Sequence, residues 1–311
     1  MGKIAFMFPG QGAQFVGMGK DFYENCEESA KVFDRACEAT DLDLKTLCFE
    51  ENDRLDQTEY TQIAMITTEI AMLRAVTKRG ITADVCAGLS LGEYGALAAA
   101  SVMEEDDIFR VVRQRGILMQ NAYPTGGAMS AVLGLDPDVT AKICEEIAKS
   151  TGKIISVANY NCPGQIVITG EKIAVDEASG KLSEAGAKRV VPLNVSGPFH
   201  SALLTDAANS LKDYLADVKI ADPVIPYVTN VTADYVTKSD QIRDLLARQI
   251  TSSVRWQQSI ERMAADGVDT FIEIGPGKTL SGFMKKINPE LKSYRVSTTE
   301  DLDKLAEEIN A

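Results

Sequence analysis

The 311-residue chain contains a single histidine, His200, and none of its six cysteines belongs to a C-x-x-C pair. Zinc sites usually combine several cysteine and histidine ligands at short spacings, so these absences argue against a metal site. Scattered cysteines without a pairing pattern are typical of the reducing cytosol, where they act as small core side chains. We therefore expect a cytoplasmic protein that binds no metal.

The sequence also lacks an apolar run long enough to cross a bilayer. Its first apolar run, Ile4–Phe8, is preceded by only one lysine and ends at Pro9-Gly10, which predicts a buried strand rather than a signal peptide. Basic residues are outnumbered: 32 lysines and arginines face 45 aspartates and glutamates, a formal net charge of −13. This charge argues against nucleic acid and anionic membranes as partners.

Two glycine-rich segments come close to nucleotide-binding motifs and fail. Gly275–Thr279 resembles the end of a P-loop, but the first glycine that the motif requires would fall on Ile272. Gly10–Gly12 begins like a dinucleotide fingerprint, but Phe15 occupies the position of the third glycine. We therefore expect no nucleotide, flavin or nicotinamide cofactor.

Strand and helix patterns alternate along the chain, which predicts an α/β fold with a mainly parallel sheet. The helix at 58–79 has apolar residues spaced for one buried face. The predicted strands are Lys3–Phe8, Asp84–Leu89, 224–229 and Thr270–Ile274. The predicted helices are 29–40, 58–79, Leu91–Ala100, Glu105–Ala122, 198–218, 239–249, 255–266 and a short helix from Lys278.

Residues 127–195 have their own order of elements, strand, helix, two strands, helix, strand, which is that of a ferredoxin-like unit. Asn159–Gly164 is expected to be the turn-rich loop between its middle strands. We predict that 127–195 is a small domain inserted into a larger one formed by 1–126 and 196–311. The expected elements are Ala128–Leu133, a helix from Asp136-Pro137 to Lys149, Ile154–Ala158, Gln165–Thr169, Ile173–Ala185 and Arg189–Leu193.

Gly88-Leu89-Ser90-Leu91-Gly92 matches the G-x-S-x-G elbow of serine nucleophiles, with an apolar strand before it and a helix after it. Glycines let the backbone turn sharply, and a helix N-terminus points N–H groups at a developing oxyanion. The alternative is an ordinary strand–helix turn in which Ser90 caps the helix. The context favours Ser90 as a nucleophile.

A serine hydroxyl needs a base, and His200 is the only imidazole available. On its own, a lone histidine in a loop that enters a helix would be read as having no role. Paired with the elbow at Ser90, it becomes the candidate base. The third group remains open: an acidic residue could complete a triad, or a backbone carbonyl could hold the imidazole N–H in a dyad.

Six short motifs together resemble the malonyl-CoA:acyl carrier protein transacylase family of type II fatty acid synthesis, and the likeness covers nearly the whole chain. The family usually has histidine directly before the serine, where this chain has Leu89. The motifs are, in order, Phe8-Pro9-Gly10-Gln11-Gly12, Ser90-Leu91-Gly92-Glu93-Tyr94, Arg115-Gly116-x-x-Met119-Gln120, Asn161-x-Pro163-Gly164-Gln165, Phe199-His200-Ser201 and Glu273-Ile274-Gly275-Pro276-Gly277.

The resemblance implies a hydrolase-like large domain with a ferredoxin-like small domain, and it implies roles for the site residues. Ser90 would carry the malonyl group and His200 would act as the base. The backbone N–H groups of Gln11 and Leu91 would form the oxyanion hole. The backbone carbonyl of Gln249 would orient the histidine, which supports a dyad.

Substrate-binding roles are implied for Arg115, Asn161 and Phe199. The malonyl group carries a free carboxylate, which a guanidinium can grip with two parallel hydrogen bonds. The alternative for Arg115 is a surface arginine on helix 105–122. The bulk of Phe199 would crowd a methyl branch on the acyl chain, an effect of about 1–3 kcal/mol.

The expected function is transfer of a malonyl group from malonyl-CoA to acyl carrier protein, without a cofactor, by a monomeric enzyme. A serine carboxylesterase-like hydrolase and a non-catalytic carrier-binding scaffold are the alternatives. Carrier proteins of this kind are typically acidic, as is this chain, so a local basic patch is expected at Lys188, Arg189, Lys285 and Lys286.

Overall fold

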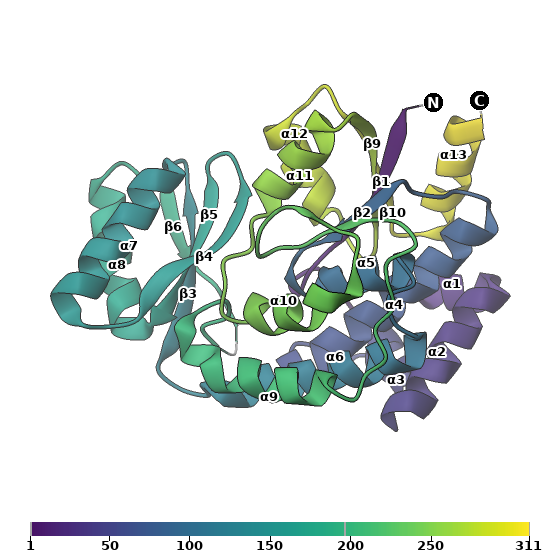
Figure 1. Cartoon of the computed structure of the whole chain (residues 1–311), viewed down its shortest axis with the longest axis horizontal. Coiled ribbons are helices and arrows are strands. Elements are labelled where there is room, and N and C mark those ends of the chain that lie inside the picture. The colour runs from purple at the N-terminus through teal and green to yellow at the C-terminus, as the bar shows by residue number, and fades with distance from the viewer. Residues whose placement is uncertain (1, 196, 311) are drawn as a thin grey trace.

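A computed structural model describes residues 2–195 and 197–310 and contains two separate sheets (Figure 1). The larger sheet has the strand order β10-β9-β1-β2-β7-β8. All neighbouring pairs in it are parallel except β7 with β8. These strands span Lys292–Val296 (β10), Val268–Ile274 (β9), Lys3–Phe8 (β1), Val85–Gly88 (β2), Tyr227–Val228 (β7) and Tyr235–Val236 (β8).

The larger sheet has a hydrophobic core on each of its two faces. The side chains of each strand point alternately into one core and into the other. From β1, Phe6 and Phe8 pack into the core that holds the helices of the first half of the chain. Ala5 and Met7 face the other core, with Trp256 of a later helix. The helices are α1 (Lys20–Asn25), α2 (Glu27–Thr40), α3 (Leu44–Phe49), α4 (Thr58–Lys78), α5 (Glu93–Ala99), α6 (Glu105–Ala122), α9 (Thr205–Leu215), α10 (Ile242–Gln249), α11 (Trp256–Ala265), α12 (Thr279–Ile287) and α13 (Thr299–Asn310).

Helix α4 differs from the expectation of a single apolar face. Sixteen of its 21 residues are buried, because it packs against α2, α6 and the sheet. A helix that is enclosed in this way buries polar side chains too, among them Gln62 and Glu69. None of the described helices is both long and apolar enough to cross a membrane.

The smaller sheet has the strand order β4-β5-β3-β6 and is antiparallel throughout. Two helices pack on it around a core of their own, which lies at one side of the molecule in Figure 1. The α/β class with a ferredoxin-like βαββαβ unit is thus confirmed. The elements are β3 (Gly127–Leu133), α7 (Pro137–Thr151), β4 (Ile155–Cys162), β5 (Gln165–Glu171), α8 (Lys172–Glu184) and β6 (Arg189–Pro192).

The predicted loop at Asn159–Gly164 is wrong, because β4 continues to Cys162 and only Pro163-Gly164 forms the turn. The extension has a tertiary cause. Tyr160 donates a backbone hydrogen bond to Val254 at 2.8 Å, and the Val254 N–H donates to Ala158 at 2.7 Å. Strand β4 is therefore held by the larger part of the chain as well as by β5.

The predicted helix at 198–218 is also shorter than expected. His200 has φ 59°, a left-handed conformation that a helix does not accommodate. Ser201 then caps a 3₁₀ turn, Ala202–Leu204, before α9 begins. The short 3₁₀ segments Ser90–Gly92 (η1) and Ser239–Gln241 (η3) similarly precede α5 and α10. The expected boundary residue Ser196 lies outside the described residues.

Candidate active site

Ser90 lies at the sharp turn between β2 and α5 and has φ 53°. The flanking glycines are required by close backbone packing. A side chain at Gly88 would collide with the backbone of Gly92, and one at Gly92 would collide with the carbonyls of Phe8 and Pro9. The Ser90 hydroxyl does not cap the helix that follows. It points toward His200, which is the arrangement that the nucleophile hypothesis predicts.

The Ser90 Oγ atom and the His200 Nε2 atom lie 2.8 Å apart, although the residues are 110 positions apart in the sequence. The other ring nitrogen, Nδ1, lies 2.8 Å from the backbone carbonyl oxygen of Gln249. A carbonyl only accepts, so Nδ1 carries the hydrogen and Nε2 has a free lone pair. No carboxylate contacts His200 in the described part of the chain, so the arrangement is a dyad.

The pKa of His200 is lowered to about 4, chiefly by burial and secondly by the nearby Arg115 cation. An imidazole with this pKa is neutral at pH 7, which is the form that can accept a proton from a serine hydroxyl.

Because the chain has one histidine, an NMR titration can test this pKa without assignment. We expect the imidazole signals of the folded protein to stay those of the neutral ring down to about pH 5. The denatured chain should titrate near the ordinary value of 6.5 and serves as the control. A midpoint near 6.5 in the folded protein would contradict the buried position of His200.

Arg115 of α6 is fully buried beside Ser90, so it is not the surface arginine of the alternative reading. Its Nη1 donates to Gln62 Oε1 at 2.7 Å, and its Nη2 lies 3.0 Å from Gln249 Oε1 and 3.3 Å from Ser90 Oγ. Its Nε has no partner among the described residues, and no carboxylate forms a salt bridge with it there. A buried cation with no carboxylate in direct contact is costly, so the site is suited to an anionic ligand that reaches the guanidinium.

Three site residues were not singled out from the sequence: Gln62, Glu93 and Asn230. The Asn230 side chain accepts a hydrogen bond from the Ser90 N–H at 2.6 Å and donates one to the Gly88 carbonyl at 2.6 Å. These two bonds stabilise the backbone conformation of the elbow. The backbone N–H of Asn230 donates to the Glu93 carboxyl at 3.1 Å. Glu93 belongs to the family motif Ser90–Tyr94, but Gln62 and Asn230 have no sequence signal that marks them.

A cavity of about 430 Å³ opens over the dyad between the two sheets. Strands β3, β4 and β5 line one side, and the elbow and the loop after β1 line the other. Leu89, where the family usually has histidine, also lines it. All the predicted site residues except Gln249 contribute to the lining: Gln11, Ser90, Leu91, Arg115, Asn161, Phe199 and His200.

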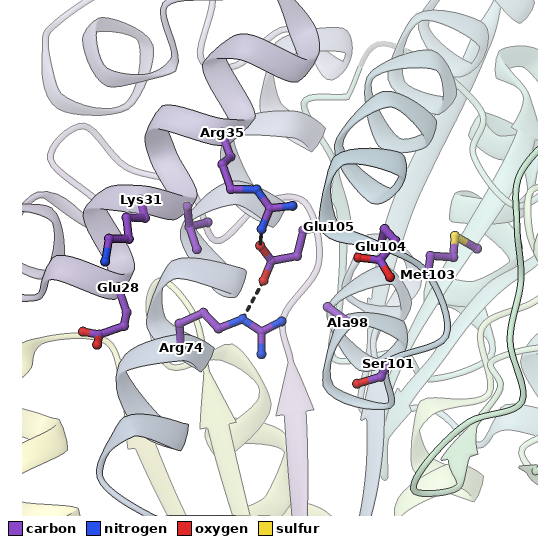
Figure 2. Close-up of a pocket in the computed structure, with 10 residues that line it drawn as sticks. Glu28, Lys31, Arg35, Arg74, Ala98, Ser101, Met103, Glu104 and Glu105 are labelled. Carbon is purple, nitrogen blue, oxygen red and sulfur yellow. Dashed lines mark hydrogen bonds and ion pairs between the residues drawn. The ribbon is translucent and has the colours of Figure 1, made fainter.

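A second cavity of about 430 Å³ lies over α2, α4 and the start of α6 and shares no lining residue with the first (Figure 2). Its two arginines, Arg35 and Arg74, both pair with Glu105, as the dashed lines in Figure 2 show. Glu28 pairs with Lys78. Since these charges are already paired within the chain, we assign no ligand to this cavity.

Residues 5–298 match the family described as acyl transferase domain, the class of protein to which this fold and site correspond. The malonyl CoA-acyl carrier protein transacylase of Bacillus subtilis (strain 168) is 46% identical over 305 residues, which are 97% of this chain and 96% of the relative. The chain belongs to the malonyl CoA-acyl carrier protein transacylase family, as its motifs predicted.

Solved structures agree with this membership. The malonyl CoA-acyl carrier protein transacylase from Clostridium perfringens is 42% identical with a TM-score of 0.95, and the match covers 99% of this chain and 97% of that one. A malonyl-transacylase solved in complex with its type II PKS acyl-carrier protein is 38% identical with a TM-score of 0.95, over 98% of this chain and 99% of that one.

Proposed function

We propose that the chain transfers a malonyl group from malonyl-CoA to the phosphopantetheine thiol of an acyl carrier protein through a malonyl-Ser90 intermediate. One observation carries the proposal: a fully buried guanidinium without a carboxylate partner lies 3.3 Å from the hydroxyl of a serine–histidine dyad. This pairing favours an acyl group that bears a carboxylate close to the reacting carbonyl.

In the first half-reaction, Ser90 Oγ attacks the thioester carbonyl while His200 Nε2 takes the hydroxyl proton. Backbone N–H groups of Gln11 and Leu91 would stabilise the oxyanion, since both residues line the cavity beside Ser90. The tetrahedral intermediate then expels the thiolate of coenzyme A, which receives the proton from His200. The Gln249 carbonyl stabilises the imidazolium that forms in between.

In the second half-reaction the carrier thiol replaces coenzyme A. His200 takes the thiol proton, and the sulfur attacks the malonyl ester. The bond to Ser90 Oγ breaks, and the serine recovers its proton from the imidazolium. Two transfers through one covalent intermediate give ping-pong kinetics.

Arg115 would hold the malonyl carboxylate and so orient the thioester carbonyl toward Ser90. The rest of the acyl pocket would be shaped by Asn161 and Phe199, which are both buried; the Asn161 Oδ1 atom has no hydrogen-bond partner among the described residues.

Phe199→Ala is expected to raise the activity with methylmalonyl-CoA about tenfold relative to the activity with malonyl-CoA, because the smaller side chain leaves room for a methyl branch. Competition between methylmalonyl-CoA and malonyl-CoA measures it, and an unchanged ratio would assign Phe199 to packing alone.

The carrier protein is proposed to dock on a basic rim beside the cavity. Thr279 and Phe283 of α12 line the cavity, and the exposed Lys285 and Lys286 follow on the same helix. Lys286 Nζ lies 3.3 Å from Gln165 Oε1, which is also a lining residue. Lys188 and Arg189 are exposed at the start of β6, and none of the four forms an ion pair with a described carboxylate.

Reversing the charges of Lys285 and Lys286 to glutamate is expected to slow transfer from preloaded malonyl-Ser90 to the carrier protein about tenfold at low salt. Transfer to free pantetheine, which has no protein surface, should be unchanged. High salt should slow transfer in the unmodified protein and reduce the difference between it and the variant. Lys219→Glu is the control and should behave like the unmodified chain, because Lys219 is exposed after α9 and forms no ion pair with any residue that the structure describes. Equal rates for both charge reversals would contradict docking on this rim.

We further propose that residues 1–126 and 196–311 form the catalytic domain and that 127–195 form the inserted one. The proposed enzyme is cytoplasmic and monomeric and uses no cofactor. A hydrolase with the same dyad would release free malonate instead of loading the carrier, and a scaffold would bind the carrier without forming an adduct.

A further inference from the structure

Glu93 is a fully buried carboxyl at the start of α5, directly after the elbow motif, and the proposed reaction has no role for it. Its Oε2 atom accepts from the Gln249 side chain at 2.6 Å and from the Asn230 N–H at 3.1 Å. Its Oε1 atom makes no hydrogen bond of standard geometry among the described residues, and the Thr229 hydroxyl lies close enough to lower the pKa of Glu93. A buried carboxylate with this few well-formed hydrogen bonds is only partly compensated for the loss of water, so the protonated form is accessible.

The Gln249 side chain links Glu93 to Arg115. Arg115 can only donate, so the Gln249 Oε1 atom must face it, at 3.0 Å. The amide nitrogen of Gln249 then points to Glu93 Oε2 at 2.6 Å and to the Ser90 carbonyl at 3.0 Å. One side chain therefore touches the cation of the site, the buried carboxyl and the backbone of the candidate nucleophile.

The charged side chain that acts on Glu93 is Arg115 of α6, whose positive charge favours the ionised carboxylate. Burial raises the pKa of Glu93 to about 7, against the opposing effects of its hydrogen bonds and of Arg115. Burial also raises the pKa values of the other titratable groups on the elements packed around it, which are Glu69 of α4, Cys86 of β2, Tyr94 of α5 and Tyr227 of β7.

We propose that Glu93 takes up a proton from solvent when the carboxylate of an acyl substrate binds Arg115, so that loading of malonyl, but not of acetyl, is coupled to proton uptake. The proposal rests on malonyl transfer as the proposed function. Without substrate, an ionised Glu93 balances the Arg115 charge. With a second carboxylate present, one buried guanidinium faces two anions, and protonation of the buried Glu93 at Oε1 removes the excess negative charge. The proton returns to solvent when the malonyl group leaves on the carrier.

The sign of the pH effect follows from linkage. A bound carboxylate raises the pKa of Glu93. The affinity for the malonyl group is therefore independent of pH below the pKa that Glu93 has without substrate. Above it, binding weakens about tenfold for each pH unit until the pKa of the loaded site is reached. An acetyl group carries no carboxylate, so its loading should not depend on the protonation of Glu93. The ratio of kcat/KM for malonyl-CoA to kcat/KM for acetyl-CoA therefore reports the Glu93 effect alone, because any titration of the shared coenzyme changes both values equally.

This ratio is expected to fall about tenfold between about pH 6 and about pH 9 in the unmodified protein. Glu93→Gln keeps the two accepted hydrogen bonds but cannot ionise, and its ratio should be independent of pH. Glu69→Gln, a change at another fully buried glutamate, is the matched control and should retain the fall. A flat ratio in the unmodified protein, or the same slope in Glu93→Gln, would overturn the proposal.

A second measurement leaves Glu93 in place, in case its replacement prevents folding. Calorimetry of malonyl-CoA binding to Ser90→Ala near pH 7, in buffers of different ionisation enthalpy, should report net proton uptake, and acetyl-CoA should report less. Equal uptake for both would disprove the coupling. If no malonyl adduct forms on the unmodified protein at any pH, the proposed function fails instead, so the two failures are distinguishable.

Discussion

Ser90→Ala is expected to abolish the covalent malonyl adduct and to slow transfer to the carrier at least about a thousandfold. The physical reason is that no other hydroxyl contacts the imidazole in the described structure, where Ser90 Oγ lies 2.8 Å from His200 Nε2. Intact-mass measurement after mixing with malonyl-CoA detects the adduct. A second measurement after adding phosphopantetheinylated carrier protein detects the transfer.

Ser101→Ala is a matched control for this result. Ser101 also has φ 53°, but it follows α5 and does not line the dyad cavity. Its variant should form the adduct and pass it on as the unmodified chain does. A malonyl adduct on Ser90→Ala would contradict the proposed nucleophile. An adduct that decays to free malonate without reaching the carrier would instead favour the hydrolase.

Arg115→Ala is expected to lower kcat/KM for malonyl-CoA by about a hundredfold or more and that for acetyl-CoA by less than about tenfold. A charge-assisted bidentate pair in a dry pocket is worth roughly 2–5 kcal/mol when one partner is removed. An acetyl group has no carboxylate and does not form this pair with Arg115, so its loading should be much less affected. Both constants come from single-turnover loading of Ser90.

Arg110 on the same helix serves as the control, since it is half-exposed and Asp107 is its only ion-pair partner among the described residues. Arg110→Ala should leave both constants within about twofold of the unmodified values. Arg115→Lys keeps the charge but not the two parallel donors, so an intermediate loss is expected. Equal losses of malonyl and acetyl loading in Arg115→Ala would show that the arginine supports the structure of the site and does not select the substrate.

The fold could be predicted where the local pattern is strong. Strand β1 and helix α6 begin and end at the predicted residues, since both have a clear period and clear terminal signals. Strands β8 and β10 and helices α1, α3 and α13 were not predicted. Strand β8 has only two residues, and β10 has only one fully buried residue at the edge of the sheet, so their sequences carry little pattern.

The site could be predicted only in part. Ser90 and His200 were predicted because the elbow motif supplies one serine and the chain has one histidine, and Arg115 was predicted because its motif resembles that of the family. Gln62 and Asn230 were not predicted, because the role of an amide side chain depends on its hydrogen-bond partners, which the sequence does not show. Asn230 meets Ser90 across 140 positions of sequence.

The sequence by itself determined the α/β class, the order of the ferredoxin-like unit, the family and the chemical types at the site, because these depend on periodicity and short motifs. Only the tertiary structure decided that the imidazole meets the hydroxyl, that no carboxylate of the described residues contacts Arg115 directly, and that Glu93 is linked to Arg115 through the Gln249 side chain. Those properties arise from burial and from hydrogen bonds between segments more than 100 residues apart, which no local pattern encodes.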